Sequence, residues 1–467
     1  MSPPLTPDQS IRPFLSHLER AGELLHVDKL VEPRYEISAF LSAADSGGPA
    51  LVFDSVAGSK LKVVGNILTS RTRVAAALDI RVDEILSALH TAIRQPLAPL
   101  RVAAAPAQEV VVRDAPLAGL PVPTFFERES RPYITAGTIL ARDPETGRGN
   151  LSFARLAILD GRTAMIGIAP NHHLALFARR AAALGRPLEI AVAIGTHPAI
   201  QLAACLYLGV GDDELECAGR LLGTPVKVVP ACTVDLLVPA DAELILEGVI
   251  EADRPVEEGL VSEYHGMYES YGPGCLATFS AQTRRKDALF QVIEPGYHRE
   301  HIYLGALPIA ARLQQVVAAV APNVGDVAVT EAGSGRTDVV VQLGNPRPGQ
   351  ARRVMFAIWA AVSIVKRITV VDTDIDPWDA VAVDWARTNR MRLERDLLLV
   401  PQSGADRSEP MEQAGLITKA GYDATAKSGD RAEDIERALP PSAASRAATD
   451  WLRANLPPER RPWLKSR

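Results

Sequence analysis

The chain has 467 residues, of which 47% are hydrophobic and 23% charged, and its 50 basic and 56 acidic side chains give a formal net charge of −6. At ~100–200 residues per domain, this length predicts about three domains. A slight acidic excess argues against a nucleic-acid-binding protein. We therefore expect a multidomain globular protein without a nucleic-acid partner.

The cysteines and the amino terminus bear on the cellular compartment. Cys205, Cys217, Cys232 and Cys275 show no C-x-x-C spacing, so we expect reduced thiols rather than disulfides or a zinc site. The initial MSPPLTPDQS lacks the basic and apolar regions of a signal peptide, and no window has the ~18–20 uninterrupted apolar residues that span a bilayer. The sequence predicts a cytoplasmic protein without a membrane partner.

Residues 1–105 alternate between helix-like and strand-like patterns. Apolar residues recur at helical spacing in IRPFLSHLERAG and EISAFLSAADS, and at strand spacing in LLHVDK, ALVFDSV and LKVVGNIL. A helical RVDEILSALHTAIR then leads into QPLAPLRVAAAPAQ (95–108), where repeated prolines interrupt the helix. We expect an N-terminal α/β domain that ends near residue 105.

Residues 106–305 are rich in strand patterns. These occur in EVVVRDA, AGTILARD, NLSFARLAIL, TAMIGIA, LEIAVAIG and VKVVPA. HLALFARRAAALG and DDELECAGRLLG have helical spacing, while VPADAELILEGVIEADRP fits either a helix or a strand. The middle of the chain is therefore predicted to form a β-rich barrel or sandwich with helical inserts.

The α/β alternation returns in residues 306–430. LPIAARLQQVVAAVA and RRVMFAIWAAVSIV are predicted helices, and VAVTEA, DVVVQL and RITVVDTD are predicted strands. The tail, residues 431–467, offers a helix broken at Pro440 and Pro441 and too few apolar residues for a core of its own. We expect a C-terminal α/β domain followed by a helical tail that makes an oligomer contact.

Two polar residues flank the strand pattern in GNLSFARL. A buried arginine needs an anion, so Arg155 favours an anionic partner, although an arginine at a solvated sheet edge fits the pattern equally well. Because side chains alternate between the faces of a strand, Asn150 and Arg155 share a site only if the strand is bulged or Asn150 lies at its very start. A binding site and an exposed edge both stay open.

A pair of histidines and an acidic residue begin two predicted helices. His172 and His173 precede LALFARR, and Glu214 follows GVGDD. A histidine at a helix start is more often a cap or a surface residue, and an acid there complements the helix dipole. As a group, however, Asn150, His173 and Glu214 form a mixed nitrogen and oxygen ligand set suited to Mn²⁺ or Mg²⁺ rather than to zinc.

Five motifs occur in the order and spacing of UbiD-type decarboxylases: GNLSFAR, NHHL, DDELECAG, PVEEGLVSE and ITVVDTDIDPWDAVAVDWARTNR. The chain resembles that family over residues 10–430. The resemblance implies a central split β-barrel that binds prenylated FMN through Mn²⁺ or Mg²⁺, with a potassium ion beside it. It also implies that a flavin prenyltransferase supplies the cofactor and that the protein is a homo-oligomer, a dimer or a hexamer.

Residues that match cofactor contacts in the family are Asn150, Ser152, Arg155, His172, His173, Glu214 and Arg390. Among these, the resemblance implies that Asn150, His173 and Glu214 are the metal ligands. One segment departs from the pattern, because Ala204 and Cys205 stand where relatives have a serine-bearing stretch that helps to hold potassium. A potassium site is therefore not favoured.

Arg155, Glu258 and Glu263 match the family's glutamate–arginine–glutamate catalytic group. The implied reaction is reversible, non-oxidative decarboxylation of an aromatic, heteroaromatic or α,β-unsaturated carboxylic acid, releasing CO₂, through a covalent adduct with prenylated FMN. We expect Arg155 to keep one acid ionised, and the apolar Gly-Leu-Val turn to raise the proton affinity of Glu263, the proton donor. Neighbouring Glu257 is predicted to be a solvated loop charge.

The segment EPGYHREHIYLGALP (294–308) is predicted to line the substrate pocket. Its candidate contacts are His298, Arg299, His301 and Leu304. The three polar ones suit a ring heteroatom or a second carboxylate, and we expect His298 to select such acids over cinnamate. The alternative is an exposed basic loop.

Two other functions fit parts of the sequence. Asp372, Asp374 and Asp376 alternate at a strand end in VVDTDID and could hold Mg²⁺ for phosphoryl transfer, but GSGRT (333–337) lacks the G-K-[ST] of a phosphate loop. A non-catalytic flavin-binding subunit would lack a catalytic acid, whereas all three catalytic positions are filled here. The sequence favours the decarboxylase.

Overall fold

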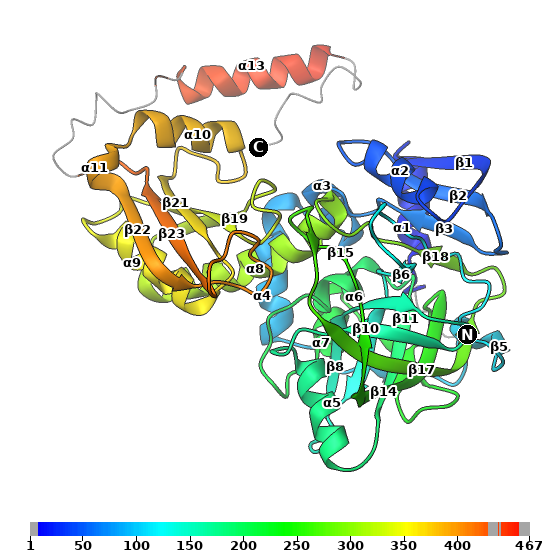
Figure 1. Ribbon diagram of the computed structural model, residues 1–467. Coiled ribbons are helices and arrows are strands. Elements are labelled where there is room, and N and C mark those ends of the chain that lie inside the picture. Colours follow the sequence, from blue (N-terminus) through cyan, green and yellow to red (C-terminus); the bar gives the residue numbers. More distant parts are fainter. Residues whose placement is uncertain (1–7, 428–437, 439, 457–467) are drawn as a thin grey trace.

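The computed structural model describes residues 8–427, 438 and 440–456. Figure 1 shows three sheet-containing regions in chain order: N-terminal (blue), central (cyan to green) and C-terminal (yellow to orange), followed by the separate helix α13. The predicted fold class is confirmed: a multidomain α/β chain with a central split β-barrel, a C-terminal α/β domain and a C-terminal helix.

The N-terminal region is a small sheet with helices packed against it. Its elements are α1 (Arg12–Arg20), β1 (Leu24–Val31), α2 (Glu36–Ala43), β2 (Ala50–Val56), β3 (Lys62–Gly65), α3 (Arg71–Ala77), the short helix η1 (Val82–Glu84) and α4 (Ile85–Arg94). The sheet order is β1-β2-β3-β18, and β18 (Leu289–Gln291) comes from much later in the chain. The N-terminal and central regions therefore share a sheet.

The central region is built on a nine-stranded sheet in the order β6-β9-β10-β17-β14-β11-β7-β8, with β5 beside β17. These strands are β5 (Val110–Val112), β6 (Tyr133–Ile134), β7 (Thr138–Arg142), β8 (Gly149–Phe153), β9 (Arg155–Ile158), β10 (Thr163–Gly167), β11 (Leu188–Ile194), β14 (Leu244–Glu257) and β17 (Pro273–Arg284). Alternate residues such as Ile190 and Val192 are fully buried and pack with Phe177 of α5 (His173–Ala183). The ambiguous segment 238–255 is therefore mainly strand, in β14.

Smaller elements complete the central region. They are β4 (Leu100–Arg101), η2 (Pro106–Gln108), α6 (Pro198–Ala203), α7 (Glu214–Leu221), β12 (Lys227–Pro230), β13 (Leu237–Pro239), β15 (Val261–Ser262) and β16 (Tyr268–Glu269). Strands β15 and β16 form a hairpin that follows β14 directly. Of the acids of the predicted catalytic group, Glu258 lies in the link from β14 to this hairpin and Glu263 lies in the hairpin itself.

Helix α8 (Arg299–Val320) leads from the central to the C-terminal region. The predicted helix begins at Leu307, so the observed helix starts eight residues earlier and the expected boundary at residue 305 falls inside it. Among the described residues, α8 alone is long and apolar enough to cross a membrane, and 61% of its most apolar window is buried inside the protein. A buried core helix has the same length and composition.

The C-terminal region is a five-stranded sheet in the order β19-β20-β21-β23-β22, flanked by helices. Its elements are β19 (Val324–Val329), β20 (Asp338–Leu343), α9 (Gln350–Ala361), β21 (Arg367–Asp372), α10 (Ala380–Asn389), α11 (Leu393–Asp396), β22 (Leu397–Gly404) and β23 (Leu416–Asp423). Val339 and Val341 of β20 face the core shared with α8 and α9, while Val340 faces α10. The period of two thus explains why both faces carry helices.

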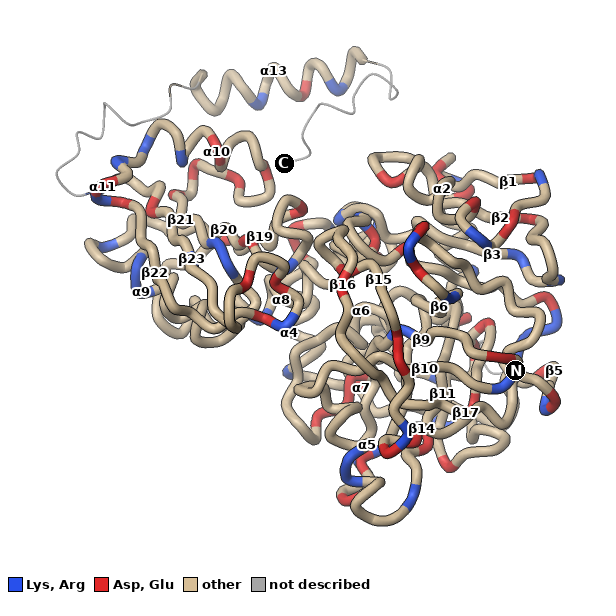
Figure 2. The backbone as a smooth tube through the Cα atoms, in the orientation of Figure 1, with Lys and Arg blue, Asp and Glu red and all other residues tan. Residues whose placement is uncertain are grey.

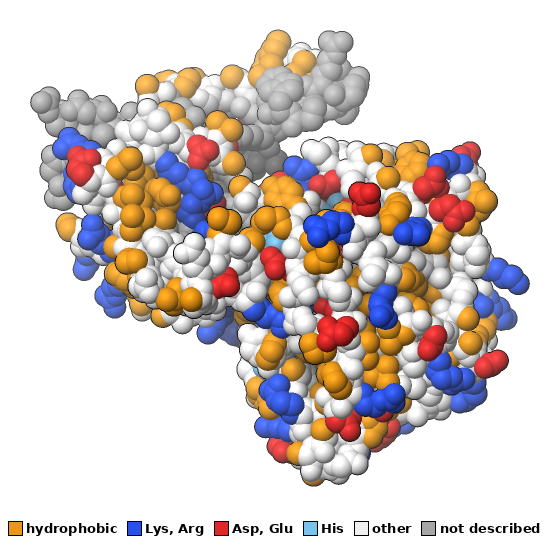
Figure 3. Space-filling model, viewed as in Figure 1, with side chains coloured by type: hydrophobic (Ala, Val, Ile, Leu, Met, Phe, Trp, Pro, Cys, Tyr) orange, Lys and Arg blue, Asp and Glu red, His pale blue; other side chains and the backbone are white. Residues whose placement is uncertain are grey.

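Helix α13 (Ser442–Asn455) has no buried residue. The predicted tail helix is confirmed for these residues, and the rest of the tail, residues 431–437, 439 and 457–467, lies outside the described residues. Its role as an oligomer contact stays a prediction. Figure 2 shows acidic and basic residues interspersed along the backbone, and Figure 3 shows their side chains interspersed over the face in view.

Candidate active site

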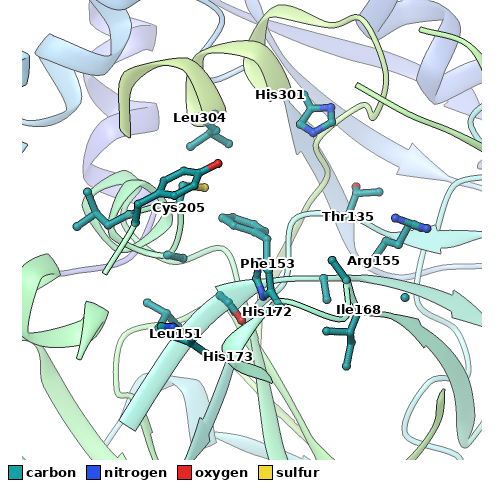
Figure 4. Close-up of a pocket in the computed structure, with 18 of the residues that line it drawn as sticks. Thr135, Leu151, Phe153, Arg155, Ile168, His172, His173, Cys205, His301 and Leu304 are labelled. Atoms are coloured by element: carbon teal, nitrogen blue, oxygen red, sulfur yellow. The ribbon is translucent and has the colours of Figure 1, made fainter. Parts of the chain in front are cut away.

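A cavity of about 570 Å³ is lined by residues of the central sheet, of α8 and of the loop between β19 and β20. The polar side chains on its wall include Asn150, Ser152, Arg155, His172, His173, Glu214, Glu263, His301 and Arg336. Figure 4 shows Arg155 and His301 on one side of the cavity and His173 and Cys205 on the other. Most of the predicted site residues therefore converge on one cavity.

The break between β8 and β9 brings Asn150 and Arg155 to this common site. The chain leaves β8 at Phe153 and enters β9 at Arg155, and these two strands lie near opposite ends of the sheet order. Asn150 is the second residue of β8, which pairs with β7, whereas Arg155 pairs with Gly167 of β10. The alternation of side chains along a single strand does not apply here, because Asn150 and Arg155 lie on two different strands. Both side chains line the cavity.

Arg155 and Glu258 form a two-point ion pair. Arg155 Nη2 donates to Glu258 Oε2 at 2.7 Å, and Nε donates to Oε1. Glu258 is 2% exposed and lies behind Arg155, whose guanidinium packs against Gly167, where a side chain would collide with it. Burial alone would lower the pKa of Arg155, but the hydrogen bonds and charge of Glu258 raise it above its usual range. Arg155 is thus a fixed cation on the cavity wall.

Glu263 follows β15 and reaches the cavity with both oxygens engaged. Oε1 accepts a hydrogen bond from the Tyr264 amide at 3.1 Å, and Oε2 accepts one from the Tyr271 hydroxyl. The expectation of a raised proton affinity is wrong. Burial raises the pKa of Glu263, but Arg155, the Tyr271 hydrogen bond and other nearby groups outweigh it and bring the pKa below its ordinary value. Glu257, in contrast, is exposed as predicted.

Asn150, His173 and Glu214 all line the cavity. His173 begins α5 and Glu214 begins α7, as the sequence predicts. Glu214 is 4% exposed, its Oε2 accepts the Leu151 amide at 2.8 Å, and burial raises its pKa to about 7. Within the described residues no basic side chain pairs with it.

The chemistry of these donors fits a bound cation. In the part of the chain that the structure describes, no three His, Cys, Asp or Glu side chains converge as a metal site by themselves. The amide oxygen of Asn150, or oxygens of a bound ligand, would have to complete the coordination. Ser152 and His172 also line the cavity, and the Asn150 amide donates to Ser152 Oγ at 3.3 Å. Burial raises the pKa of the Cys205 thiol to about 12, so it stays protonated and is a poor ligand for potassium.

Of the predicted substrate contacts at the start of α8, some line the cavity and others point away from it. His301 and Leu304 line the cavity, together with Gly305 and Ile309, because these positions share one face of the helix. His298 is the N-cap of α8 and lies in a second cavity of about 270 Å³, with its Nε2 3.3 Å from Asp45 Oδ1. The assignment of His298 to the pocket wall is therefore wrong.

Arg299 also turns away from the cavity. Its Nη2 lies 3.1 Å from Glu331 Oε2, and its amide donates to Asp45 Oδ1 at 2.9 Å. His301 instead accepts a hydrogen bond at Nε2 from Arg336 at 3.1 Å, and burial lowers its pKa to about 3. His301 is therefore neutral, which excludes an exposed basic loop.

Arg390, at the end of α10, and the aspartates at the end of β21 lie in the C-terminal region and do not line the cavity. Arg390 donates to Asp374 at 2.9 and 2.5 Å and to Asp372 at 3.4 Å, while Asp376 accepts the Trp378 amide. The prediction that Arg390 contacts the cofactor is not supported, since local aspartates occupy its guanidinium. The same contacts neutralise the aspartates that the phosphoryl-transfer alternative needs.

Arg336 is a residue of the cavity that the sequence did not reveal. It comes from the GSGRT turn between β19 and β20, and its guanidinium lies 4.8 Å from the centre of the Tyr264 ring. Gly305 makes room for it, because a Cβ at Gly305 would lie 3.0 Å from Arg336 Cζ. The one sequence signal is the run of glycines before the arginine. Its position over the cavity follows only from the packing of the C-terminal sheet on α8.

The fold and this site define a carboxy-lyase of three successive parts. The 3-octaprenyl-4-hydroxybenzoate carboxy-lyase N-terminal domain matches residues 15–93, its Rift-related domain residues 100–298 and its C-terminal domain residues 302–424. The chain therefore belongs to the UbiD family of carboxy-lyases.

Individual relatives cover almost the whole chain. An anhydromevalonate phosphate decarboxylase of Methanosarcina mazei is 31% identical over 432 residues, which are 92% of this chain and 99% of that protein. The UbiD-class enzyme HmfF from Pelotomaculum thermopropionicum, solved in complex with FMN, has a TM-score of 0.90 and 35% identity over 95% of this chain and 100% of its own. Vanillic acid decarboxylase of Sedimentibacter hydroxybenzoicus, in its closed form, has a TM-score of 0.82 and 26% identity over 96% and 99%.

Proposed function

We propose that the protein catalyses the reversible, non-oxidative decarboxylation of an unsaturated, aromatic or heteroaromatic carboxylic acid with prenylated FMN and a divalent cation, Mn²⁺ or Mg²⁺. One observation carries this proposal. The Arg155–Glu258 pair and Glu263 lie at the same cavity as Asn150, His173 and Glu214. A proton-transfer group and a group suited to hold a cation with a phosphate therefore share one chamber.

Residues at one end of the cavity fit the cofactor. Asn150, His173 and Glu214 would hold the divalent cation, which supplies the positive charge that buried Glu214 lacks, and Ser152 and His172 lie beside them. HmfF has been solved with FMN and, in an evolved dimeric form, with prenylated FMN. When bound, the prenylated flavin supplies a temporary sink for the electron pair that CO₂ leaves behind.

The other residues orient the acid and move the proton. Arg155, fixed by Glu258, presents a cation to the carboxylate of the substrate. Glu263 donates the proton that replaces CO₂ at the same carbon. Because the pKa of Glu263 is below its ordinary value, the side chain is ionised before the reaction and must gain a proton in each turnover.

Arg336 supports a narrower substrate class. Among the described residues no acidic side chain pairs with it, and its contacts are a ring, His301 and a backbone carbonyl. The charge of Arg336 helps to lower the pKa of Glu263, but no carboxylate of the described residues forms a direct ion pair with its guanidinium, and this favours a ligand anion. We propose that the acid carries a second anionic group, a carboxylate or a phosphate. The Methanosarcina mazei relative is named for a phosphate-bearing substrate.

The test uses protein produced with and without a flavin prenyltransferase. Deuterium uptake at the carbon that has lost CO₂ is measured in the decarboxylated products of simple cinnamates, heteroaromatic monoacids, dicarboxylic acids and phosphate-bearing unsaturated acids. We expect exchange only in prenyltransferase-treated protein, fastest on acids with a second anionic group. Colourless protein that is fully active would refute the cofactor, and faster exchange on cinnamate than on every dianionic acid would refute the substrate class.

A further inference from the structure

Two tyrosines hold the carboxylate of Glu263, and both contact the C-terminal region. The Tyr264 amide and the Tyr271 hydroxyl each donate to one of its oxygens. Tyr264 follows Glu263 directly, and Tyr271 lies beyond the β15–β16 hairpin. Both oxygens of the proton donor are thus fixed by groups outside the Arg155–Glu258 pair.

Besides Arg336, which lies 4.8 Å from the centre of the Tyr264 ring, the contacts from the C-terminal region come from the connection between β22 and β23 (residues 405–415). Arg407 Cζ lies 4.0 Å from the centre of the Tyr271 ring, and Arg155 Cζ lies 5.2 Å from the same centre. The hydroxyls of Ser408 and Tyr264 are hydrogen-bonded at 3.1 Å, and both residues are buried. Consecutive residues of one connection therefore touch both tyrosines.

This connection is itself anchored to its own domain. Asp406 Oδ1 accepts hydrogen bonds from the amide and hydroxyl of Ser408, and Glu409 Oε1 lies 2.9 Å from Lys366 Nζ. Arg407 and Ser408 are therefore presented on a fixed turn rather than on a free loop. A fixed turn can transmit the position of the C-terminal sheet to the tyrosines.

We infer that Tyr271 is a positioning residue for Glu263, and that Arg407 and Ser408 hold the Tyr271–Glu263–Tyr264 arrangement in place from the C-terminal domain. The inference rests on the proposed function. It assigns to the β22–β23 connection a part in the proton step rather than in the loss of CO₂, because both tyrosines that it touches donate hydrogen bonds to Glu263, whereas the Arg155–Glu258 pair meets Tyr271 only through the 5.2 Å ring contact of Arg155. Without the hydroxyl of Tyr271, Glu263 loses the one side-chain donor to Oε2 that the described residues provide.

Two exchange reactions separate the proton step from carbon–carbon cleavage. Incorporation of ¹³CO₂ into the substrate carboxylate needs only reversible cleavage, whereas deuterium uptake by the decarboxylated product needs Glu263. For Tyr271→Phe we expect deuterium uptake to fall about 10- to 100-fold, the size of effect that misplacing a reacting group has. Exchange of ¹³CO₂ should change by less than about threefold on the same grounds. Equal losses in both reactions, or no loss, would overturn the inference.

Arg407→Ala should lower deuterium uptake about three- to tenfold, and Arg407→Lys should restore most of it, since an ammonium also binds a ring face. The matched control is Arg34→Ala, which removes a similar arginine–tyrosine contact of 4.9 Å from the N-terminal region. The control should leave both exchange rates unchanged. A loss in Arg34→Ala equal to that in Arg407→Ala would also overturn the inference.

A second readout does not need the cofactor. In cofactor-free protein, mass spectrometry of amide hydrogen exchange reports the Tyr264 amide, which donates to Glu263 Oε1, and the Gly266 amide, which donates to the Glu263 carbonyl. Arg407→Ala and Ser408→Ala should speed exchange in residues 262–268, and Arg34→Ala should not. Unchanged protection would refute the inference even if no acid exchanged with the wild-type enzyme, a result that would count against the proposed function alone.

Discussion

The acidic side chains around the cavity and those at the end of β21 differ in where they come from in the sequence and in how their charges are compensated. Glu214, Glu258 and Glu263 come from separate elements and are brought together only by the fold. Asp372 and Asp374 sit in one short run and are held by Arg390 from the end of the next helix. The aspartates at the end of β21 form the denser cluster in the sequence, yet their role is structural, because Arg390 already compensates their charges.

The difference lies in what remains for a ligand. At the end of β21, a local arginine takes up the aspartate oxygens, so a bound cation would have to displace it. In the cavity, Glu214 has no cationic partner among the described residues, and Glu263 is fixed by neutral donors. Among these acids Glu214 is therefore the clearest guide to a bound cation, because its counter-charge is missing, whereas Glu258 and the β21 aspartates already have an arginine partner.

The largest effect is expected from Glu263→Gln. An amide of the same shape cannot donate the proton, so turnover should fall by ~10²–10⁴, the range for losing a general acid. Metal content and the flavin spectrum should stay as in the wild type, because Glu263 lies outside the group proposed to hold the cation. Metal analysis and absorption spectra check the second part, and loss of the flavin would show that the role assignment is wrong.

Replacing the proposed cation ligands should give a different phenotype. His173→Ala and Glu214→Ala are expected to lose metal and flavin together, lowering metal affinity by at least ~10–100-fold. Asp372→Asn is the matched control, since it removes a half-buried carboxylate that already has an arginine partner. If the control lost as much metal as Glu214→Ala, the conclusion that only the cavity acids bind a cation would be wrong.

Much of the fold follows from local patterns, and the misses have physical causes. Helices α1, α2, α5 and α9 and strands β1, β2, β7, β11 and β20 lie where apolar spacing predicts them. Strand β17, PGCLATFSAQTR, has no clear alternation, and its long pairing with β14 defines it. Strands β22 and β23 were missed as well, and their pairing with each other defines them.

The candidate site divides in a similar way. Asn150, Arg155, His173 and Glu214 stand at strand starts and helix starts, where a local motif marks them. His298 was placed wrongly because α8 begins one residue after it and turns His301 to the cavity instead. Arg336, Tyr271 and Arg407 could not be predicted, since their roles depend on how the C-terminal sheet packs on α8 and on the β15–β16 hairpin.

Substrate selectivity should depend on Arg336. Arg336→Met keeps the bulk against Gly305 but removes the charge, so the preference for dianionic acids over cinnamate should fall ~5–150-fold, which corresponds to ~1–3 kcal/mol for an unpaired polar group. Metal and flavin content should not change. Ratios of kcat/KM for paired acids provide the measurement, and an unchanged ratio would mean that the second anion binds elsewhere or is not required.

The pH dependence should follow Glu263. Its pKa lies below the ordinary value, so the protonated fraction falls up to about tenfold per pH unit at neutral pH, and deuterium uptake should fall likewise from about pH 6.5 to 8.5. Three groups around it do not titrate there: the pKa of Arg155 is raised above its usual range, and the pKa values of His301 and Tyr271 lie on either side of this range. At a constant concentration of dissolved CO₂, exchange of ¹³CO₂ should stay nearly level, and a fall in both reactions would point to another group.

The smallest effect is expected from Asp374→Asn. The variant weakens the pair with Arg390 but leaves Asp372 and a neutral amide beside the guanidinium. Since half-exposed ion pairs contribute ~1 kcal/mol or less, the melting temperature should fall by no more than ~2–4 °C. Activity, metal and flavin should stay within about twofold, because nothing in this cluster contacts the cavity. The melting temperature and the activity of the variant are measured together. A tenfold loss of activity in a well-folded variant would show that the β21 aspartates have a functional role.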